Sequence, residues 1–345
     1  MKILHIVWGL ENGGAENMLA DIINVQLKTE NVTLLVINDL LDYNIINRID
    51  RKCNFVFFRR KLGSKNPFYF VKLNLFILFG KFDIVHLHQN TIIGKLFIPA
   101  NYVRTVHNTN QSFHDYRWHK GIIAISDSVK HELDELGYVN SVQINNGINF
   151  DLIKTCSKRN TDDIFRIVQV SRILFRQKGQ DILLKAFNEI IKSGFNKIHL
   201  YFIGEGPDEE KLKMMIDKAN LSNYVFLLGN CSRNYIYNNL YKYDLFIQPS
   251  RFEGFGLTVV EAMAAKIPVL VSRNEGPLQI IENGKFGFSF DNGNYKDAEK
   301  QIFNIIQNYP SAEFLNRAYN HVKALYSVER TALAYLDEYK KILNK

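Results

Sequence analysis

DLFIQPSRFEGFGLTVVEAMAAKIPVLVS, residues 244–272, is typical of a strand, a helix and a second strand in succession. The apolar runs 245–250 and 268–272 have the length of buried strands, and 257–265 has the composition of a helix. Strands joined through a helix run parallel, and strands that are apolar on both faces need helices on both sides of the sheet. This stretch therefore predicts an α/β fold with a parallel sheet.

The same alternation of short apolar runs and helical patterns extends along the chain in two series. Strands are expected at 2–10, 32–38, 54–58, 82–88, 102–108 and 121–126, and again at 165–171, 197–204, 225–229, 245–250, 268–272 and 287–290. A length of 345 residues favours two domains. We predict an N-terminal domain over 1–150, a polar linker over 151–163, a C-terminal domain over 164–325, and a C-terminal helix over 326–345 that packs towards the N-terminal domain.

Composition excludes several classes of protein. Three widely spaced cysteines argue against a disulfide framework, so a reducing cytoplasm is the expected location. The N-terminal run lacks the small residues of a signal-peptide cleavage site. The longest apolar stretch, 68–80, contains Lys72 and Asn74 and is shorter than the roughly 20 residues of a membrane-spanning helix.

Residues 51–81 hold eight Lys or Arg and no acidic residue, which equals the whole net charge of +8. Eight Phe and Tyr residues are interleaved with these cations. One interpretation is a buried strand and a core helix, capped by Asn66 with Pro67 in its first turn, whose charges are solvated. The other is an interfacial patch for anionic lipids of the inner leaflet, which would make the protein peripheral to the membrane. Both can hold, and nucleic acid is not expected as a partner.

Loops after the expected strands carry candidate ligand groups. Gly13 and Gly14 precede a helix and can offer N–H groups to an anion, although an ordinary tight turn explains them equally well. The loop does not match the dinucleotide fingerprint G-x-G-x-x-G. Arg172 and Lys178, in the loop after 165–171, suit a diphosphate, or they are solvated loop cations.

Three further glycines lie at strand ends. Gly204 and Gly206 precede Pro207 at the start of an expected helix, and Gly229 is the last residue of the expected strand 225–229. They suit close approach of a ligand or of backbone, and an ordinary tight connection is the simpler alternative.

Glu253 and Glu261 are separated by two glycines that disfavour a continuous helix. The helix is expected to begin near Leu257, which leaves Glu253 in a loop and Glu261 in the helix. Free N–H groups between them favour phosphate or sugar oxygens, and a carboxylate can accept two hydroxyls of a ribose. The alternative is a loop glutamate and a solvated helix glutamate.

Taken in order, the segments GGAE, VHN, SRILFRQKG, IGEGP, VFLLG, residues 244–272 and the later EGP and NGK resemble the retaining family 4 glycosyltransferases of the GT-B fold. The similarity is greatest to bacterial enzymes that build O-antigen, capsule or related surface polysaccharides. It implies two Rossmann-like doubly wound domains that face each other across a cleft, with the acceptor bound by the N-terminal domain and the nucleotide sugar bound by the C-terminal domain. Two residues depart from the pattern of this family: Ser171 stands where glycine is frequent, and Gln279 stands where glutamate is frequent. These departures are expected to affect donor choice or loop packing more than the reaction class.

The resemblance implies transfer of a hexose or N-acetylhexosamine, with retention, from a nucleotide diphosphate sugar, by default a UDP-sugar, to a saccharide or polyprenyl-linked acceptor. The implied catalytic residues are Glu253 and His107 at the donor sugar and Arg172 and Lys178 at the diphosphate. The residues implied to bind the nucleotide sugar are Gly13, Gly14, Gly204, Gly206, Gly229, Gly254, Phe255, Gly256, Leu257, Thr258 and Glu261.

No cofactor is expected, and no Asp-x-Asp or other acidic cluster suits Mg²⁺ or Mn²⁺. Two other classes remain open. One is a nucleotide-dependent oxidoreductase or epimerase built from two α/β units, which lacks its fingerprint. The other is a non-enzymatic protein that binds membrane or nucleic acid through residues 51–81, which leaves the strand-end loops unexplained.

Overall fold

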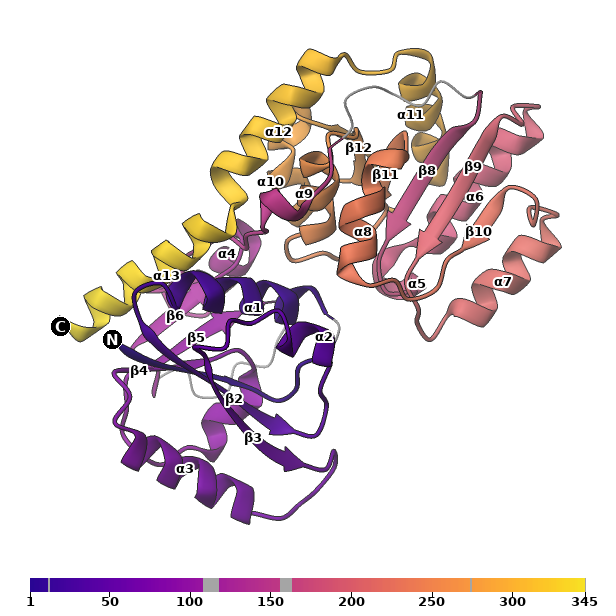
Figure 1. The fold of residues 1–345 in the computed structure, drawn as a ribbon. Helices are drawn as coiled ribbons and strands as arrows, with labels where there is room; N and C mark the ends of the chain where they lie inside the picture. The colour runs from indigo at the N-terminus through magenta and orange to yellow at the C-terminus, as the bar shows by residue number, and fades with distance from the viewer. Residues whose placement is uncertain (12, 108–117, 156–162, 274, 345) are drawn as a thin grey trace. The chain divides into compact units, whose positions relative to one another are not determined.

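The computed structural model describes residues 1–11, 13–107, 118–155, 163–273 and 275–344, which form two compact α/β units (Figure 1). Unit 1 comprises Met1–Ile148 and Tyr326–Lys345, and unit 2 comprises Asn149–Leu325. Each unit contains one sheet, and all the strand pairs found in both sheets are parallel. The predicted pair of doubly wound α/β domains is confirmed. Residues 156–162 of the expected linker and Asn108 of the VHN segment lie outside the described residues.

The sheet of unit 1 has seven strands in the order β3-β2-β1-β4-β5-β6-β7. These strands are β1 Lys2–Val7, β2 Asn31–Asn38, β3 Asn54–Arg60, β4 Ile84–Leu87, β5 Tyr102–Val106, β6 Gly121–Ala124 and β7 Val142–Gln143. The helices are α1 Gly14–Gln26, α2 Tyr43–Ile46, α3 Phe68–Gly80, α4 Asp127–Glu135 and α13 Val328–Leu343, with a 3-10 helix η1 at Asn90–Lys95. The strand order reverses between β1 and β4, where ligands of such sheets bind beyond the carboxyl ends of the strands.

The sheet of unit 2 has six strands in the order β10-β9-β8-β11-β12-β13. They are β8 Phe165–Val170, β9 Ile198–Ile203, β10 Val225–Leu227, β11 Leu245–Gln248, β12 Val269–Ser272 and β13 Phe288–Phe290. The helices are α5 Phe175–Lys178, α6 Gln180–Lys192, α7 Glu209–Lys218, α8 Arg233–Asn239, α9 Leu257–Ala264, α10 Glu275–Ile280, α11 Tyr295–Gln307 and α12 Ala312–Tyr326, with 3-10 helices η3 Phe150–Leu152, η4 Leu240–Lys242 and η5 Glu282–Gly284. Here the order reverses between β8 and β11.

The last helix completes the core of unit 1. Tyr335 and Tyr339 of α13 are fully buried in one apolar cluster with Ile3 and Val103 of the sheet, and α13 also contacts α1 (Figure 1). The phenol of Tyr339 hydrogen-bonds His86 Nδ1, and that of Tyr335 lies 3.1 Å from Thr105 Oγ1. Because buried hydroxyls need partners, these two bonds fix how α13 lies on the sheet.

Helix α3 differs from the core helix that one interpretation of residues 51–81 predicted. Only Leu73, Asn74 and Ile77 are buried. The buried Asn74 amide donates to the carbonyls of Phe70 and Lys95, which attaches the helix to the end of η1. Tyr69 and Phe76 pack partly against the same core. Five other apolar side chains of α3 are exposed, since the helix is apolar around its whole circumference but packs on one side only; they are Phe68, Val71, Leu75, Leu78 and Phe79.

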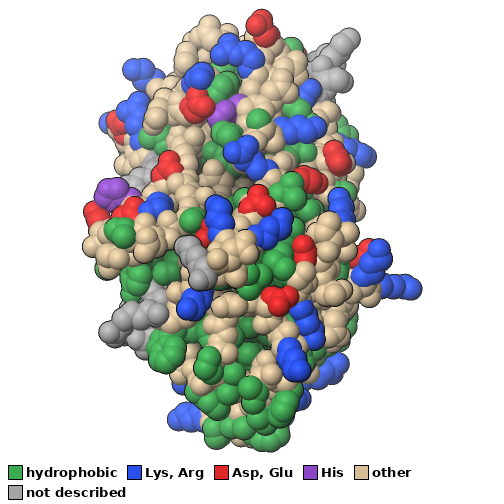
Figure 2. All heavy atoms as spheres, turned by 90° about the vertical axis from the view of Figure 1, so that its left-hand side faces the viewer, with side chains coloured by type: hydrophobic (Ala, Val, Ile, Leu, Met, Phe, Trp, Pro, Cys, Tyr) green, Lys and Arg blue, Asp and Glu red, His purple; other side chains and the backbone are tan. Residues whose placement is uncertain are grey.

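Figure 2 shows a broad hydrophobic area with cations beside it at the end of the molecule where α3 lies. We call the exposed apolar side chains on and near this helix the α3 patch; they are Leu62, Phe68, Val71, Leu75, Leu78, Phe79 and Phe97. Within the described residues, no helix is long and apolar enough to cross a membrane.

Candidate functional site

In unit 2, the loops that follow β8, β9 and β10 bond to one another through their backbones. Ile173 N donates to Glu205 O at 2.9 Å, and Gly204 N donates to Gly229 O at 2.8 Å. A Cβ on Gly204 or Gly206 would overlap the backbone oxygen of Ser171 or Ile173, respectively. These glycines are therefore needed where two loops pack against each other, a physical reason that differs from close approach of a ligand.

The segment from Arg172 to Lys178 is a structured turn. Residues Phe175–Lys178 form the short helix α5, which sequence reasoning treated as loop. Asp208 Oδ2 accepts a hydrogen bond from Phe175 N at 2.9 Å, which fixes the start of α5. Arg172 is exposed, and its guanidinium makes no ion pair within the described residues.

Lys178 and Glu253 meet at the carboxyl ends of β8 and β11. Lys178 Nζ lies 2.6 Å from Glu253 Oε2, and the two side chains are only 17% and 14% exposed. Gln248 Nε2 donates to the same oxygen at 2.9 Å. Gln248 is buried at the end of β11, so the strand itself holds the Glu253 carboxylate in place.

Helix α9 begins where the glycines predicted. Gly256, at φ +104°, is the N-cap, a left-handed conformation that glycine adopts readily. Phe255 is buried, Leu257 begins the helix, and Thr258 Oγ1 lies 3.4 Å from Gln248 Oε1. A Cβ on Gly276 would come within 2.6 Å of Glu253 O and 2.8 Å of the carbonyl carbon of Gly254, so the EGP segment packs tightly beneath this loop.

Glu261 lies one turn into α9 and is 9% exposed. Tyr237 OH donates to Glu261 Oε1 at 3.1 Å, and Arg233 Nε donates to Tyr237 OH at 2.7 Å. The guanidinium of Arg233 also lies over the Tyr237 ring. Helix α8 thus orients the carboxylate of Glu261, a support that sequence reasoning did not identify.

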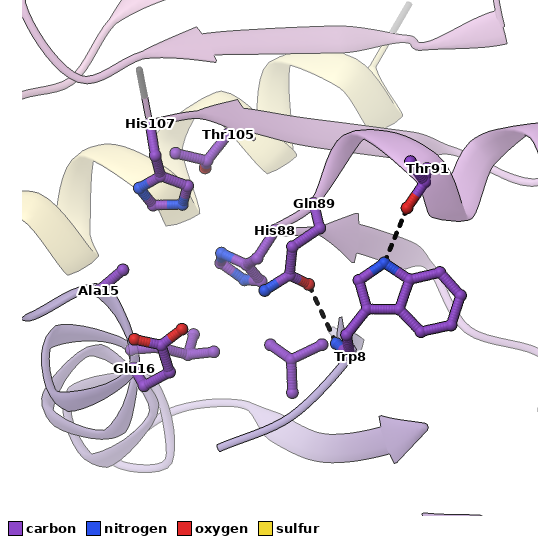
Figure 3. A pocket seen from close by; sticks show the side chains of 10 residues that line it. Trp8, Ala15, Glu16, His88, Gln89, Thr91, Thr105 and His107 are labelled. Atoms are coloured by element: carbon purple, nitrogen blue, oxygen red, sulfur yellow. Dashed lines mark hydrogen bonds between the residues drawn. The ribbon is translucent and has the colours of Figure 1, made fainter. Parts of the chain in front are cut away.

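Unit 1 has a cavity of about 410 Å³ beyond the carboxyl ends of β1, β4 and β5 (Figure 3). It is lined by Val7, Trp8, Ala15, Glu16, Leu19, His88, Gln89, Thr91, Thr105 and His107. Glu16 on α1, His88 after β4 and His107 after β5 lie around the same space, and the Trp8 indole is fixed by its Nε1–H bond to Thr91 at 2.8 Å. Of these residues, sequence reasoning identified only His107.

Burial lowers the pKa of several histidines of unit 1. It lowers the pKa of His107 to about 4, an effect that the Arg104 charge reinforces, and it lowers the pKa of His5 to about 4 against a smaller opposing effect of the Gln26 hydrogen bond. The pKa of His88 is also well below 6.5, because of burial and the neighbouring histidines. At neutral pH these rings act as hydrogen-bonding groups and carry no charge.

Gly13 and Gly14 lie at the start of α1, where the predicted anion-binding amides would be. A Cβ on Gly13 would overlap Oε2 of Glu16, so the carboxyl group of Glu16 folds over this helix end. Burial raises the pKa of this carboxyl group, and the charge of Glu11 adds to the effect. The helix end therefore already has an acidic neighbour.

The two units carry separate halves of the predicted site. Unit 2 brings Lys178 together with Glu253 and holds Glu261 through Tyr237. Unit 1 places His107 at its cavity, and it places Gly13 and Gly14 at the start of α1, next in sequence to the lining residues Ala15 and Glu16. Glu16 and His88 were missed, although the last letter of GGAE and the alternate histidines of the strand 82–88 were the available signals.

The sequence of residues 155–321 matches the family described as glycosyl transferases group 1. Unit 2 is a group 1 glycosyltransferase domain. An uncharacterized glycosyltransferase of Methanocaldococcus jannaschii is 29% identical to this chain over 270 residues, which are 77% of this chain and 71% of that protein. The capsular polysaccharide biosynthesis glycosyltransferase CapM of Staphylococcus aureus is 30% identical over 208 residues, or 54% of this chain and 52% of CapM.

The whole chain also resembles solved GT-B structures. HepE of Anabaena, in a crystal structure with UDP and glucose, superposes with a TM-score of 0.82 over 98% of this chain and 99% of HepE, at 19% identity. The predicted family resemblance and the GT-B fold are both confirmed. The chain spans about half or less of the length of several curated relatives that it matches.

Proposed function

We propose that the protein is a retaining glycosyltransferase. It moves a hexose or N-acetylhexosamine from a UDP-sugar to a saccharide or lipid-linked saccharide during synthesis of a surface polysaccharide. The group 1 domain supports the reaction class, the UDP and glucose of the HepE structure support the donor, and the similarity to CapM supports the pathway. The single observation that carries the proposal is the Lys178–Glu253 pair at the strand ends of that domain.

Transfer breaks the bond between the anomeric carbon and the diphosphate oxygen and forms a bond to an acceptor hydroxyl oxygen. The electron pair stays on the departing UDP, and the hydroxyl proton leaves the acceptor. The main demand is to neutralise charge on the diphosphate, which preorganised cations and N–H dipoles can do. Arg172, Lys178 and the amides of Gly256, Leu257 and Thr258 supply these groups in unit 2, so no metal cofactor is required.

The two carboxylates hold opposite ends of the donor. Glu253, fixed by Lys178 and Gln248, accepts hydroxyls of the sugar. Glu261, oriented by the Tyr237 bond, accepts the ribose diol. In unit 1, the family resemblance assigns His107 to the donor sugar and Gly13 and Gly14 to the nucleotide sugar. In unit 2, Gly204, Gly206, Gly229, Gly254 and Phe255 belong to the backbone of the proposed nucleotide-sugar site.

The membrane is the second proposed partner. The α3 patch exposes Phe68 by 63%, Phe79 by 76% and Leu62 by 73%. Exposed lysines lie beside it, namely Lys61, Lys65, Lys72 and Lys81. Apolar side chains that enter the headgroup region while lysines remain at the surface are the arrangement of a peripheral protein on anionic lipid. This patch would hold the enzyme at the inner leaflet, where a lipid-linked acceptor resides.

The defining experiment is a panel of nucleotide sugars tested for hydrolysis and transfer, with UDP-glucose and UDP-N-acetylglucosamine first. Release of UDP with retention at the anomeric carbon is expected. Binding of NAD(P) without turnover of any nucleotide sugar would instead support the oxidoreductase or epimerase alternative. If the protein neither turns over a nucleotide sugar nor binds a nucleotide, the remaining alternative is a non-enzymatic protein that binds membrane or nucleic acid.

A further inference from the structure

Two buried glutamines close the turn that runs from Arg172 to Lys178. Gln169, on β8 before the turn, donates from Nε2 to the carbonyl oxygen of Lys178 at 2.9 Å. Gln180, the first residue of α6 after the turn, donates from Nε2 to the carbonyl oxygen of Arg172 at 2.9 Å. Both glutamine side chains are buried. The residue before the turn thus holds its end, and the residue after the turn holds its start.

Ser171 links the two glutamine side chains. Its hydroxyl oxygen lies 3.1 Å from Gln169 Nε2 and 3.0 Å from Gln180 Nε2. A backbone carbonyl oxygen only accepts, so each amide must present its nitrogen to the turn, with one N–H for the carbonyl and the other for Ser171. The hydroxyl oxygen has two lone pairs and can accept both bonds. The serine at a position where glycine is frequent in the family therefore supplies the atom that joins both amides.

The same arrangement leaves one buried atom of each glutamine unsatisfied. Oε1 of Gln169 and Oε1 of Gln180 have no hydrogen-bond partner among the described residues. A buried acceptor without a partner lowers the stability of the folded state. Departures of this kind are expected at functional sites, where stability is given up for geometry. Here the two unsatisfied side chains directly bond the turn that carries both cations of the predicted diphosphate site.

We propose that Gln169 and Gln180 are positioning residues for the diphosphate of the donor. They fix the main chain from which Arg172 and Lys178 extend, so both cations are in place before a ligand arrives. Charges that are ordered in advance stabilise a developing anion without a further cost of reorganisation. The assignment rests on the proposed function, in which these cations hold UDP, and it gives their placement to two uncharged residues that act only through the turn.

The ratio of the UMP Kd to the UDP Kd, measured by isothermal titration calorimetry, reports the hold on the second phosphate. Contacts to the base, the ribose and the first phosphate are common to both ligands and cancel in this ratio. Gln180→Met keeps the length of the side chain without its amide. It should lower the ratio about tenfold, the loss expected for one charge-assisted hydrogen bond, with little change in UMP affinity. Gln169→Met should act in the same direction, whereas Gln307→Met, exposed at the end of α11, should change neither affinity.

A double-mutant cycle tests whether each glutamine acts through its cation. In an Arg172→Ala background, Gln180→Met should cause no further decrease of the ratio, because the group that it positions is absent. Lys178→Ala should likewise remove the effect of Gln169→Met. A purely structural role would weaken UMP and UDP equally, or would add its loss in both backgrounds, and either result would overturn the proposal. An unchanged ratio in both single glutamine variants would also overturn it.

Hydrogen exchange of the turn requires neither a ligand nor turnover. The backbone amides of residues 173–179 should exchange faster in both glutamine variants than in wild type, and equal rates would contradict the proposal. If the buried substitutions prevent folding, Ser171→Ala, at the half-buried junction of the two amides, should show the faster exchange in their place. If wild type neither binds UDP nor turns over any nucleotide sugar, the proposed function fails, and the exchange rates still decide whether the glutamines hold the turn.

Discussion

The ammonium group of Lys178 lies 2.6 Å from Glu253 Oε2, although one residue precedes α6 and the other precedes α9. Each charge compensates the other in a place where both are mostly buried. A donor diphosphate that reaches Lys178 must therefore compete with Glu253. In the proposed function, the pair couples the group that would hold the leaving phosphate to the group that would hold the sugar.

Removing the ammonium group should slow transfer far more than it destabilises the fold. We expect Lys178→Ala to lower turnover of the nucleotide sugar by about 10²–10³-fold, as for loss of one preorganised group at a developing charge. Steady-state kinetics of UDP release measure this effect. Lys192→Ala, at an exposed lysine of α6, is the control. A folded Lys178→Ala enzyme with normal turnover would refute the assigned role.

Glu261 should determine nucleotide affinity. Glu261→Gln retains the shape of the side chain but removes the charged acceptor for the ribose diol. We expect UDP to bind about tenfold more weakly, because a hydrogen bond to a charged group becomes a neutral one. Isothermal titration calorimetry with UDP tests this, with Glu313→Gln on α12 as the exposed control. Unchanged affinity would exclude the ribose contact.

The α3 patch predicts a membrane-binding phenotype that separates apolar from charged contributions. Phe68→Ser with Phe79→Ser should reduce binding to phosphatidylglycerol vesicles at all salt concentrations, because both side chains are exposed and their loss costs little stability. Lys61→Ser with Lys65→Ser should reduce it mainly at low salt.

Arg60 is unsuitable for that experiment, since its guanidinium bonds Asn38 and Ser64 within unit 1. Co-sedimentation with neutral phosphatidylcholine vesicles is the lipid control. If neither pair of substitutions changes binding to anionic vesicles, α3 is not the contact surface.

The buried histidines make unit 1 sensitive to acid. His5 and His107 have folded pKa values of about 4, and those of His86 and His88 are well below 6.5. Between pH 6.5 and about 4 the unfolded chain binds protons that the folded unit does not, so stability falls as pH falls. Melting temperatures from pH 7.5 to 5 should show this loss.

His5→Gln should flatten that pH dependence because it removes one of the four rings. His131→Gln, at an exposed ring on α4, should not. An identical slope in wild type and His5→Gln would show that the buried rings do not contribute.

Gly206 tests the packing of the strand-end loops. A methyl group at this position would overlap the carbonyl oxygen of Ile173, so Gly206→Ala should destabilise unit 2 by about 1–3 kcal/mol. Gly94→Ala is a matched control, because its Cβ would meet open space. Chemical denaturation of both variants provides the comparison, and equal midpoints would show that the loops can separate without cost.

The sequence predicts much of this architecture because its strands are short apolar runs with glycine-rich ends. Leu257 begins α9 as expected, since Gly254 and Gly256 prevent an earlier start. Helix α5 was missed because Phe175–Lys178 is too short for a periodic signal, and its cap, Asp208, lies 33 residues away.

Contacts between residues that are far apart in the sequence also limit the prediction of the sites. Pairing of Lys178 with Glu253 joins residues 75 apart, and no local pattern indicates it. The outward face of α3 could not be predicted either. An apolar helix is expected to be buried, and only its packing against the sheet and η1 in the folded unit shows that a single side is covered.

The return of α13 to unit 1 imposes an order on folding during synthesis. Unit 2 is a continuous segment, so it can fold once Leu325 has left the ribosome, whereas the sheet of unit 1 lacks Tyr335 and Tyr339 until the last helix is made. Until then His86 and Thr105 have no phenol partner, and the apolar face beside them is open to water. The first domain to be translated is therefore the last to be completed, and that interval is when the nascent chain is most exposed to aggregation and to chaperones.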